Sequence, residues 1–117
     1  MTEAEFEAAV VDLAHMFGWK VAGFRPAQTS KGWRTPVKYD GKGWPDLTLV
    51  HPQHGIIFAE LKSPSGHIEP EQAAWLTLLD TAAGVASKVR VVVWRPSDAD
   101  EVSATLSAGR VTTWQLT

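Results

Sequence analysis

The 117-residue sequence contains no cysteine. This absence excludes disulfide bonds, zinc sites built from cysteine, and thiol nucleophiles. The sequence also lacks any apolar run approaching the ~18 residues that a membrane-spanning helix needs, so a soluble protein is expected. Its first residues, Met1-Thr2-Glu3, lack the basic and apolar regions of a secretory signal peptide. We therefore expect a cytoplasmic location.

A strong net charge is missing as well, because the formal total is only -2. A value this close to neutral argues at first sight against a nucleic-acid partner. The charges are unevenly placed, however: residues 20–42 carry a net +5 and the remainder carries -7. Hydrophobic residues make up 44% of the chain. This content is typical of a globular protein, and the length predicts a single domain over residues 1–117.

Helical periodicity predicts a first helix over residues 3–17. Thr2 and Glu5 have the spacing of a capping box, and Gly18 is expected to end the helix. The apolar residues that share one face of this helix are Phe6, Val10, Leu13 and Phe17.

Two further helices are expected in the second half of the chain. Pro70 suits the first position of a helix over 70–83, which Gly84 would end. Ser97 is expected to cap a short acidic helix over about 98–107.

Short runs of apolar and β-branched residues predict strands at 19–24, 46–51, 56–62, 89–94 and about 110–116. The turn at 52–55 favours an antiparallel hairpin in which residue 46 lies opposite residues 61–62. The run at 89–94 is nearly all apolar, which predicts a strand buried on both faces. Because a helical crossover leads to it, this strand is expected to be parallel to its neighbour. The fold class is therefore α/β, with a mixed sheet flanked by helices in the order α-β-β-β-α-β-α-β.

Residues 25–45 are rich in proline and glycine and predict a long loop that contains at most a short hairpin. A loop of about twenty residues is more often functional than idle. Its basic side chains are candidates for binding phosphates, and Trp33 is a candidate for stacking on bases. The candidate nucleic-acid-binding residues are Arg25, Lys31, Trp33, Arg34, Lys38 and Lys42. Trp44 is expected to pack under the hairpin, and Trp19, Trp75 and Trp94 in the core.

The residues that carry chemistry are Asp46, Glu60 and Lys62, which the predicted hairpin brings to one end of the sheet. Two carboxylates of this kind can hold Mg²⁺ or Mn²⁺, and a nearby lysine can orient a water molecule. The same three residues could instead form an exposed ion pair across two strands. Charges that interrupt the apolar run 57–61 favour the metal site, because burying unpaired charge is costly.

At these positions the sequence resembles the PD-(D/E)xK nucleases, through Trp44-Pro45-Asp46 and Glu60-Leu61-Lys62. More narrowly, it resembles the virus-type replication-repair nuclease (VRR-NUC) domain, in the small stand-alone form found in phages and bacteria. The supporting segments are Glu3 with Phe6, Gly18-Trp19, Pro70-Glu71-Gln72 and Val93-Trp94-Arg95-Pro96.

The resemblance implies a restriction-endonuclease-like core and a role for each matching residue. Asp46 and Glu60 would be metal ligands, together with the carbonyl of Leu61. Lys62 would be the catalytic lysine, and Gln72 would lie near the metal and the substrate phosphate. Glu3, from the first helix, would complete or support the metal site.

The leading hypothesis is an endonuclease that uses Mg²⁺ or Mn²⁺ to hydrolyse phosphodiester bonds in DNA. Small enzymes of the type that the sequence resembles are expected to act as homodimers on flapped, Holliday-junction or other branched DNA. Replication, recombination or repair in a bacterial or phage-infected cell would be the setting.

Two alternatives remain open. The chain could be a DNA-binding module that has kept the fold without the activity, or a protein-interaction domain whose tryptophans form a docking surface. Histidines add two minor hypotheses. His51 and His54 could hold zinc, although no third ligand is evident, and His67 could touch a phosphate.

Overall fold

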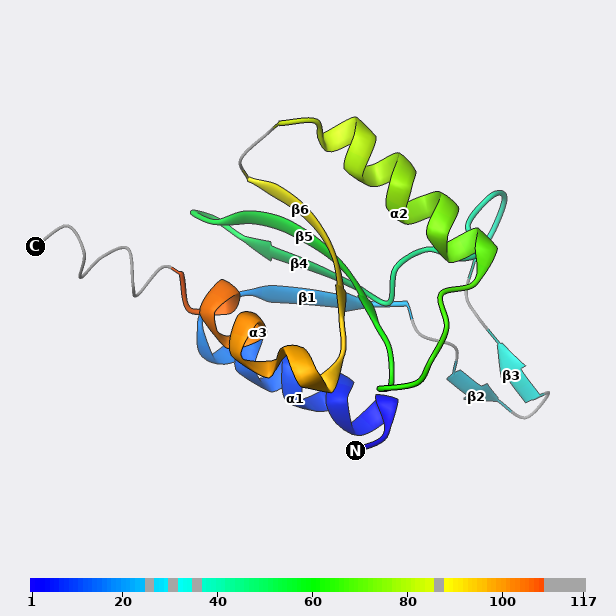
Figure 1. Ribbon diagram of the computed structural model, residues 1–117, viewed down its shortest axis with the longest axis horizontal. Coiled ribbons are helices and arrows are strands. Elements are labelled where there is room, and N and C mark those ends of the chain that lie inside the picture. The colour runs from blue at the N-terminus through cyan, green and yellow to red at the C-terminus, as the bar shows by residue number, and fades with distance from the viewer. Residues whose placement is uncertain (25–26, 30–31, 35–36, 86–87, 109–117) are drawn as a thin grey trace, which may run out of the picture.

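The structure is a computed structural model that describes residues 1–24, 27–29, 32–34, 37–85 and 88–108, with the backbone alone at 27–29 and 32–34 (Figure 1). The helices are α1 (Glu3–Met16), α2 (Pro70–Ala83), the short 3₁₀-helix η1 (Pro96–Asp98) and α3 (Ala99–Leu106). The strands are β1 (Lys20–Gly23), β2 (Ala27–Thr29), β3 (Gly32–Arg34), β4 (Leu47–His51), β5 (Gly55–Leu61) and β6 (Val89–Trp94). The strand predicted at 110–116 lies outside the described residues.

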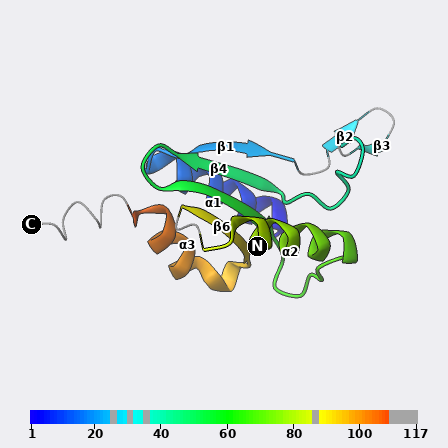
Figure 2. The same ribbon diagram turned by 90° about the horizontal axis from the view of Figure 1, so that it is seen from above.

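The central sheet is mixed, as the sequence predicts, and has the strand order β1-β4-β5-β6. Strand β4 pairs antiparallel with both β1 and β5, whereas β5 and β6 are parallel. Helix α2 makes the crossover between those two parallel strands. Strands β2 and β3 form a separate antiparallel hairpin, which projects from the end of the sheet where β1 finishes and β4 begins (Figures 1 and 2).

The main hydrophobic core lies between the sheet and the pair of helices α1 and α3. Figure 1 shows these two helices on one face of the sheet and α2 on the other. Full burial of an aliphatic side chain contributes about 1.5–3 kcal/mol, so this layer supplies much of the driving force for folding. The buried apolar residues are Phe6, Val10, Ala14, Trp19, Leu47, Leu49, Ile57, Ala59, Leu61, Trp94, Val102 and Leu106.

Local signals at the ends of α1 and α2 behave as predicted. The Thr2 amide donates to Glu5 Oε1 (2.8 Å), and the Glu5 amide donates to Thr2 Oγ1 (3.1 Å), which completes the capping box. Helix α2 begins at Pro70 and ends before Gly84. Within the described residues, none of the helices combines the length and apolarity that crossing a membrane would require.

Three expectations are wrong in detail. Strand β6 is the edge of the described sheet rather than a strand buried on both faces, so Val93 is 37% exposed and only Trp94 is buried. Ser97 does not cap α3, because it lies inside η1 and Asp98 precedes the helix. Trp75 is half-buried beside an open pocket, whereas Trp19 and Trp94 are in the core as expected.

Candidate active site

The β4–β5 hairpin brings Asp46 and Glu60 together. The register pairs Leu47 with Ala59, so Asp46, one residue before β4, lies level with Glu60 and not with residues 61–62 as the sequence suggested. Two hydrogen bonds fix the pair: the Asp46 amide donates to Glu60 Oε1 (3.3 Å), and the Leu61 amide donates to Asp46 Oδ2 (2.9 Å). Each carboxylate is thus held by the backbone of the opposite strand.

Glu60 is a buried carboxylate in an unusual electrostatic setting. It is 1% exposed, and Lys62, at 9%, is nearly as buried. Lys62 Nζ lies 3.4 Å from Glu60 Oε2 in an ion pair. Burial, followed by the negative charge of Asp46, raises the pKa of Glu60 to about 7, although Lys62 opposes this rise.

The Oε2 atom of the Glu60 carboxylate is available to a further ligand. The contact that Glu60 Oε2 makes within the described part of the chain is the 3.4 Å ion pair with Lys62 Nζ, and this contact does not have the geometry of a strong hydrogen bond. Hard divalent cations take carboxylate oxygens as ligands, so a cation beside Asp46 and Glu60 would satisfy this atom. Among the described residues no cluster of three or more histidine, aspartate or glutamate side chains forms. The carboxylate oxygens of Asp46 and Glu60 are of the type that a hard cation such as Mg²⁺ binds, and this cation commonly keeps several water ligands.

Gln72, at the start of α2, shares a pocket of about 210 Å³ with Asp46. Gly43 makes this proximity possible: its φ is +91°, and a Cβ at this position would lie 2.5 Å from the carbonyl carbon of Glu71. The Gln72 side chain is partly engaged, because its Oε1 accepts a hydrogen bond from the Glu69 amide (2.8 Å). The amide nitrogen is the part of Gln72 left to donate to a ligand.

With this geometry established, comparison with known proteins identifies the family. The model of the VRR-NUC domain matches residues 25–95, which is more than half of the chain. The chain belongs to the VRR-NUC family. A solved structure described as a VRR_NUC domain has the same fold, with a TM-score of 0.52 and 21% identity over 87% of this chain and 95% of that one. The search of curated proteins finds no match.

Membership of the VRR-NUC family places the chain in a nuclease superfamily and implies DNA binding. The segment that matches includes Asp46, Glu60 and Lys62, and it also includes Gln72. Glu3 lies outside that segment. It is half-buried in the first turn of α1, which Figures 1 and 2 both show near the end of β5. Glu3 does not join the two strand carboxylates in a three-acid cluster.

The structure describes only some of the basic residues of the VRR-NUC segment. Lys38 and Lys42 are exposed, and Lys42 Nζ lies 3.3 Å from Glu71 Oε1. Trp33 and Arg34 belong to β3, but their side chains are outside the described part of the structure. Arg25 and Lys31 lie outside the described residues. Figure 2 shows the hairpin that carries β3 at the end of the sheet where β4 begins, and Asp46 directly precedes β4.

The histidine hypotheses gain little from the structure. The rings of His51 and His54 lie 4.5 Å apart, tilted by 42°, beside Trp19, but no third metal ligand accompanies them in the described residues. Burial, helped by the nearby charges of His51, Arg90 and Lys88, lowers the pKa of His54. His67 is exposed in the loop that follows Lys62.

Sequence reasoning missed the structural role of Arg95. Its Nη1 donates to the carbonyls of Ser63 (2.7 Å) and Gly66 (2.8 Å) and so holds the loop that follows Lys62. The available signal was an arginine directly after the strand that is parallel to β5. A strand's carboxyl end lies beside that of its parallel neighbour, so Arg95 was bound to lie near residues 62–66.

Proposed function

We propose that this chain is a metal-dependent endonuclease that hydrolyses phosphodiester bonds in branched or flapped DNA. The main support is the buried Glu60 carboxylate, which lies beside Asp46 and whose Oε2 is held only by the 3.4 Å ion pair with Lys62 among the described residues. Two further observations support the proposal. The chain belongs to a family of nuclease domains, and Asp46 and Glu60 form an acidic pair at the end of a hairpin. The proposal treats residues 1–117 as one catalytic domain.

Asp46 and Glu60 would hold Mg²⁺ or Mn²⁺, and the Leu61 carbonyl and water molecules would complete the ligand set. When bound, such a cation lowers the pKa of a water molecule and offsets negative charge on the phosphate. The backbone bonds from Asp46 and Leu61 keep both carboxylates in place before any ligand arrives. The pKa of Glu60 is raised, as is expected for a buried carboxylate at a site where a bound cation would favour its charged form.

The remaining site residues act on the substrate. Lys62 would orient the attacking water and stabilise charge that develops on the phosphate. The Gln72 amide nitrogen would donate to a phosphate oxygen, from the pocket that Gln72 shares with Asp46. Glu3 would support the acidic side of the site from the first turn of α1.

DNA would lie along the basic stretch beside the site. Its phosphates would contact Arg25, Lys31, Arg34, Lys38 and Lys42, and Trp33 would stack on a base. One site can cut only one strand at a time, so cutting two strands of a junction calls for a homodimer. Sedimentation of the full chain at several concentrations tests the dimer directly.

The catalytic proposal is tested with purified protein, branched and linear DNA, and Mg²⁺, Mn²⁺ or EDTA. Lys62→Ala and Glu60→Ala should each lower the cleavage rate by at least ~100-fold, the usual cost of removing one group that stabilises the transition state. Lys88→Ala is the matched control, because Lys88 is exposed and precedes β6 at the opposite end of the sheet. Full activity of either variant would contradict the assignment of Glu60 and Lys62 to the active site. Binding of DNA without cleavage, and without divalent metal in calorimetry, would favour an inactive DNA-binding module.

A further inference from the structure

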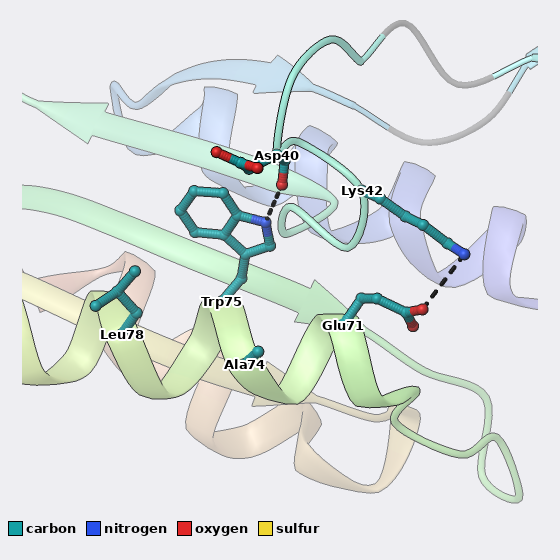
Figure 3. A pocket seen from close by; sticks show the side chains of 6 residues that line it. All are labelled: Asp40, Lys42, Glu71, Ala74, Trp75 and Leu78. Atoms are coloured by element: carbon teal, nitrogen blue, oxygen red, sulfur yellow. Dashed lines mark hydrogen bonds and ion pairs between the residues drawn. The ribbon is translucent and has the colours of Figure 1, made fainter.

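A second pocket adjoins the proposed active site along α2 (Figure 3). Its volume is about 410 Å³, within the range of roughly 300–1,000 Å³ that is usual for small-molecule sites. Two of its lining residues, Lys42 and Glu71, also line the pocket that contains Asp46 and Gln72. A ligand that extends from the acidic site along α2 would therefore reach this second pocket. The residues that line it are Asp40, Lys42, Glu71, Ala74, Trp75 and Leu78.

Trp75 gives the pocket a fixed aromatic wall. Its indole Nε1 donates to the Asp40 carbonyl (3.0 Å), as Figure 3 shows. The Trp44 ring packs against it at 5.0 Å and 76°. These two contacts hold the indole in one orientation and occupy its only donor. The ring surface that still faces the pocket is apolar and already in place for a ligand.

Leu78 extends the apolar surface by one helical turn. It is 59% exposed although it lies beside Trp75 in the same pocket. Figure 3 shows Leu78 and Trp75 on successive turns of α2, with the loop at Asp40 opposite them. A flat apolar group could therefore contact both side chains at once.

The rim of the pocket carries charges that suit a nucleotide. Lys42 and its partner Glu71 are 80% and 45% exposed, and an exposed ion pair of this kind is weak. Lys42 can therefore move to a phosphate at little cost. The carboxylates of Asp40 and Glu71 can accept hydrogen bonds from the exocyclic amino group of a base.

We propose that this pocket binds one unpaired base of the DNA substrate, packed on Trp75 and Leu78, close to the phosphate that is cut. The proposal rests on the nuclease function proposed above. At 1.5 Å per residue, Trp75 and Leu78 lie about 4.5 and 9 Å along α2 from Gln72. With a rise of ~3.4 Å per stacked nucleotide, the base belongs within about three nucleotides of the cut.

An unpaired base is favoured because of the pocket's shape. A base inside a duplex keeps both faces stacked on its neighbours, so it cannot enter a concave site without leaving the stack. A base in a flap or at a junction has already lost those contacts. The pocket would thus select DNA with an unpaired nucleotide beside the cut, which gives a physical reason for a preference for branched DNA.

The test replaces each nucleotide around the cut of a flapped DNA, one at a time, by an abasic residue. An abasic residue at one position within three nucleotides of the cut should lower kcat/KM about tenfold, the usual worth of stacking one base on an aromatic side chain. Leu78→Asp should lower cleavage of the normal flap by a similar factor and remove the dependence on that base. Val85→Asp is the matched control, because Val85 is fully exposed just beyond α2 and outside the pocket.

Each outcome decides the proposal. If no abasic position matters, or if Leu78→Asp behaves like Val85→Asp, the base site is wrong while the nuclease function stands. If the wild-type protein cleaves nothing, the nuclease function fails, and 2-aminopurine at each flap position is then followed in EDTA. Fluorescence quenching that Leu78→Asp removes and Val85→Asp keeps would support the base site, and its absence would overturn the site.

Discussion

The two faces of the central sheet differ in what they bury. On the face covered by α1 and α3, Leu49 and Ile57 are fully buried. On the face covered by α2, their neighbours in the same strands are more accessible: Val50 is 43% exposed and Phe58 is half-buried. Helix α2 itself has no buried residue. Since side chains alternate along a strand, two strands supply both of these different surfaces.

What the α2 face does bury is charge, at Glu60 and Lys62. Burying ionised groups costs free energy unless they are paired, whereas burying aliphatic groups stabilises the fold. The face covered by α1 and α3 therefore contributes most of the stability. The α2 face can then keep charges and open pockets that contribute little to it.

The largest expected effect concerns the buried face. Leu49→Ala should lower the free energy of unfolding by about 2–5 kcal/mol, because it leaves a cavity in a fully buried layer. Leu78→Ala removes the same atoms from an exposed site on α2 and should change that free energy by no more than ~0.5 kcal/mol. Urea unfolding of both variants measures the contrast. Similar losses in the two would mean that the faces contribute equally.

A smaller effect is expected from the charge of Glu60. Its pKa is about 7 in the folded protein against 4.5 as the reference value. The folded carboxyl therefore binds its proton more tightly than the unfolded one. Without metal, this contribution to the free energy of unfolding is present below pH 4.5 and is lost as the pH rises through about 7. The loss should reach up to roughly 3 kcal/mol.

Urea unfolding in EDTA between pH 5 and pH 8 measures this loss, with Glu60→Gln as the isosteric control. The difference between the two proteins isolates Glu60 from the other titrating groups, His54 among them. Adding Mg²⁺ at pH 8 should restore stability to the wild-type protein only. A wild-type curve parallel to that of Glu60→Gln would show that the carboxyl is not perturbed.

The smallest effect is expected at the exposed edge of the α2 face. Lys42→Ala breaks a solvent-exposed ion pair and should change the free energy of unfolding by less than ~0.5 kcal/mol. If Lys42 contacts a phosphate, the same variant should reduce the salt dependence of DNA binding by about one unit of slope. Lys88→Ala, at the far end of the sheet, should leave that slope unchanged. Titrations at several salt concentrations in EDTA distinguish the two lysines.

Much of the fold followed from local signals in the sequence. The capping box at Thr2 and Glu5 and the proline at position 70 fix where α1 and α2 begin, and both depend only on near neighbours. The parallel pairing of β5 and β6 followed from the intervening helix. The exposure of β6 did not, because which strand lies at the edge depends on the order of the whole sheet.

At the candidate site, sequence patterns predicted that Asp46 and Glu60 approach each other better than they predicted the register. The meeting of Asp46 and Glu60 followed from strand alternation and a short turn, but the register was off by at least one residue. The reason lies at Gly55, which has φ +89° and pairs with His51, so the ladder continues closer to the turn than the sequence suggested. The hydrogen bond that engages Gln72 depends on how α2 begins, which residue types alone do not reveal.

The pocket at Trp75 was not predicted at all. Its position within a predicted helix marked Trp75 as a core residue, and nothing in that position shows that the loop at Asp40 stops short of covering it. Contacts between a loop and a helix far apart in the sequence are set by tertiary packing. Such loop–helix contacts are therefore the part of this site that sequence patterns predict least well.

The close contact at Gly43 affects which substitutions the surrounding sequence can tolerate. Main-chain atoms, and not side chains, set the separation between the loop before Asp46 and the first turn of α2. The side chains of Lys38, Tyr39 and Asp40 point into solvent beside that contact. Under the proposed function, substitutions there would alter which DNA the surface accepts while the spacing of Asp46 and Gln72 stays the same. The architecture would thus separate the choice of substrate from the proposed chemistry.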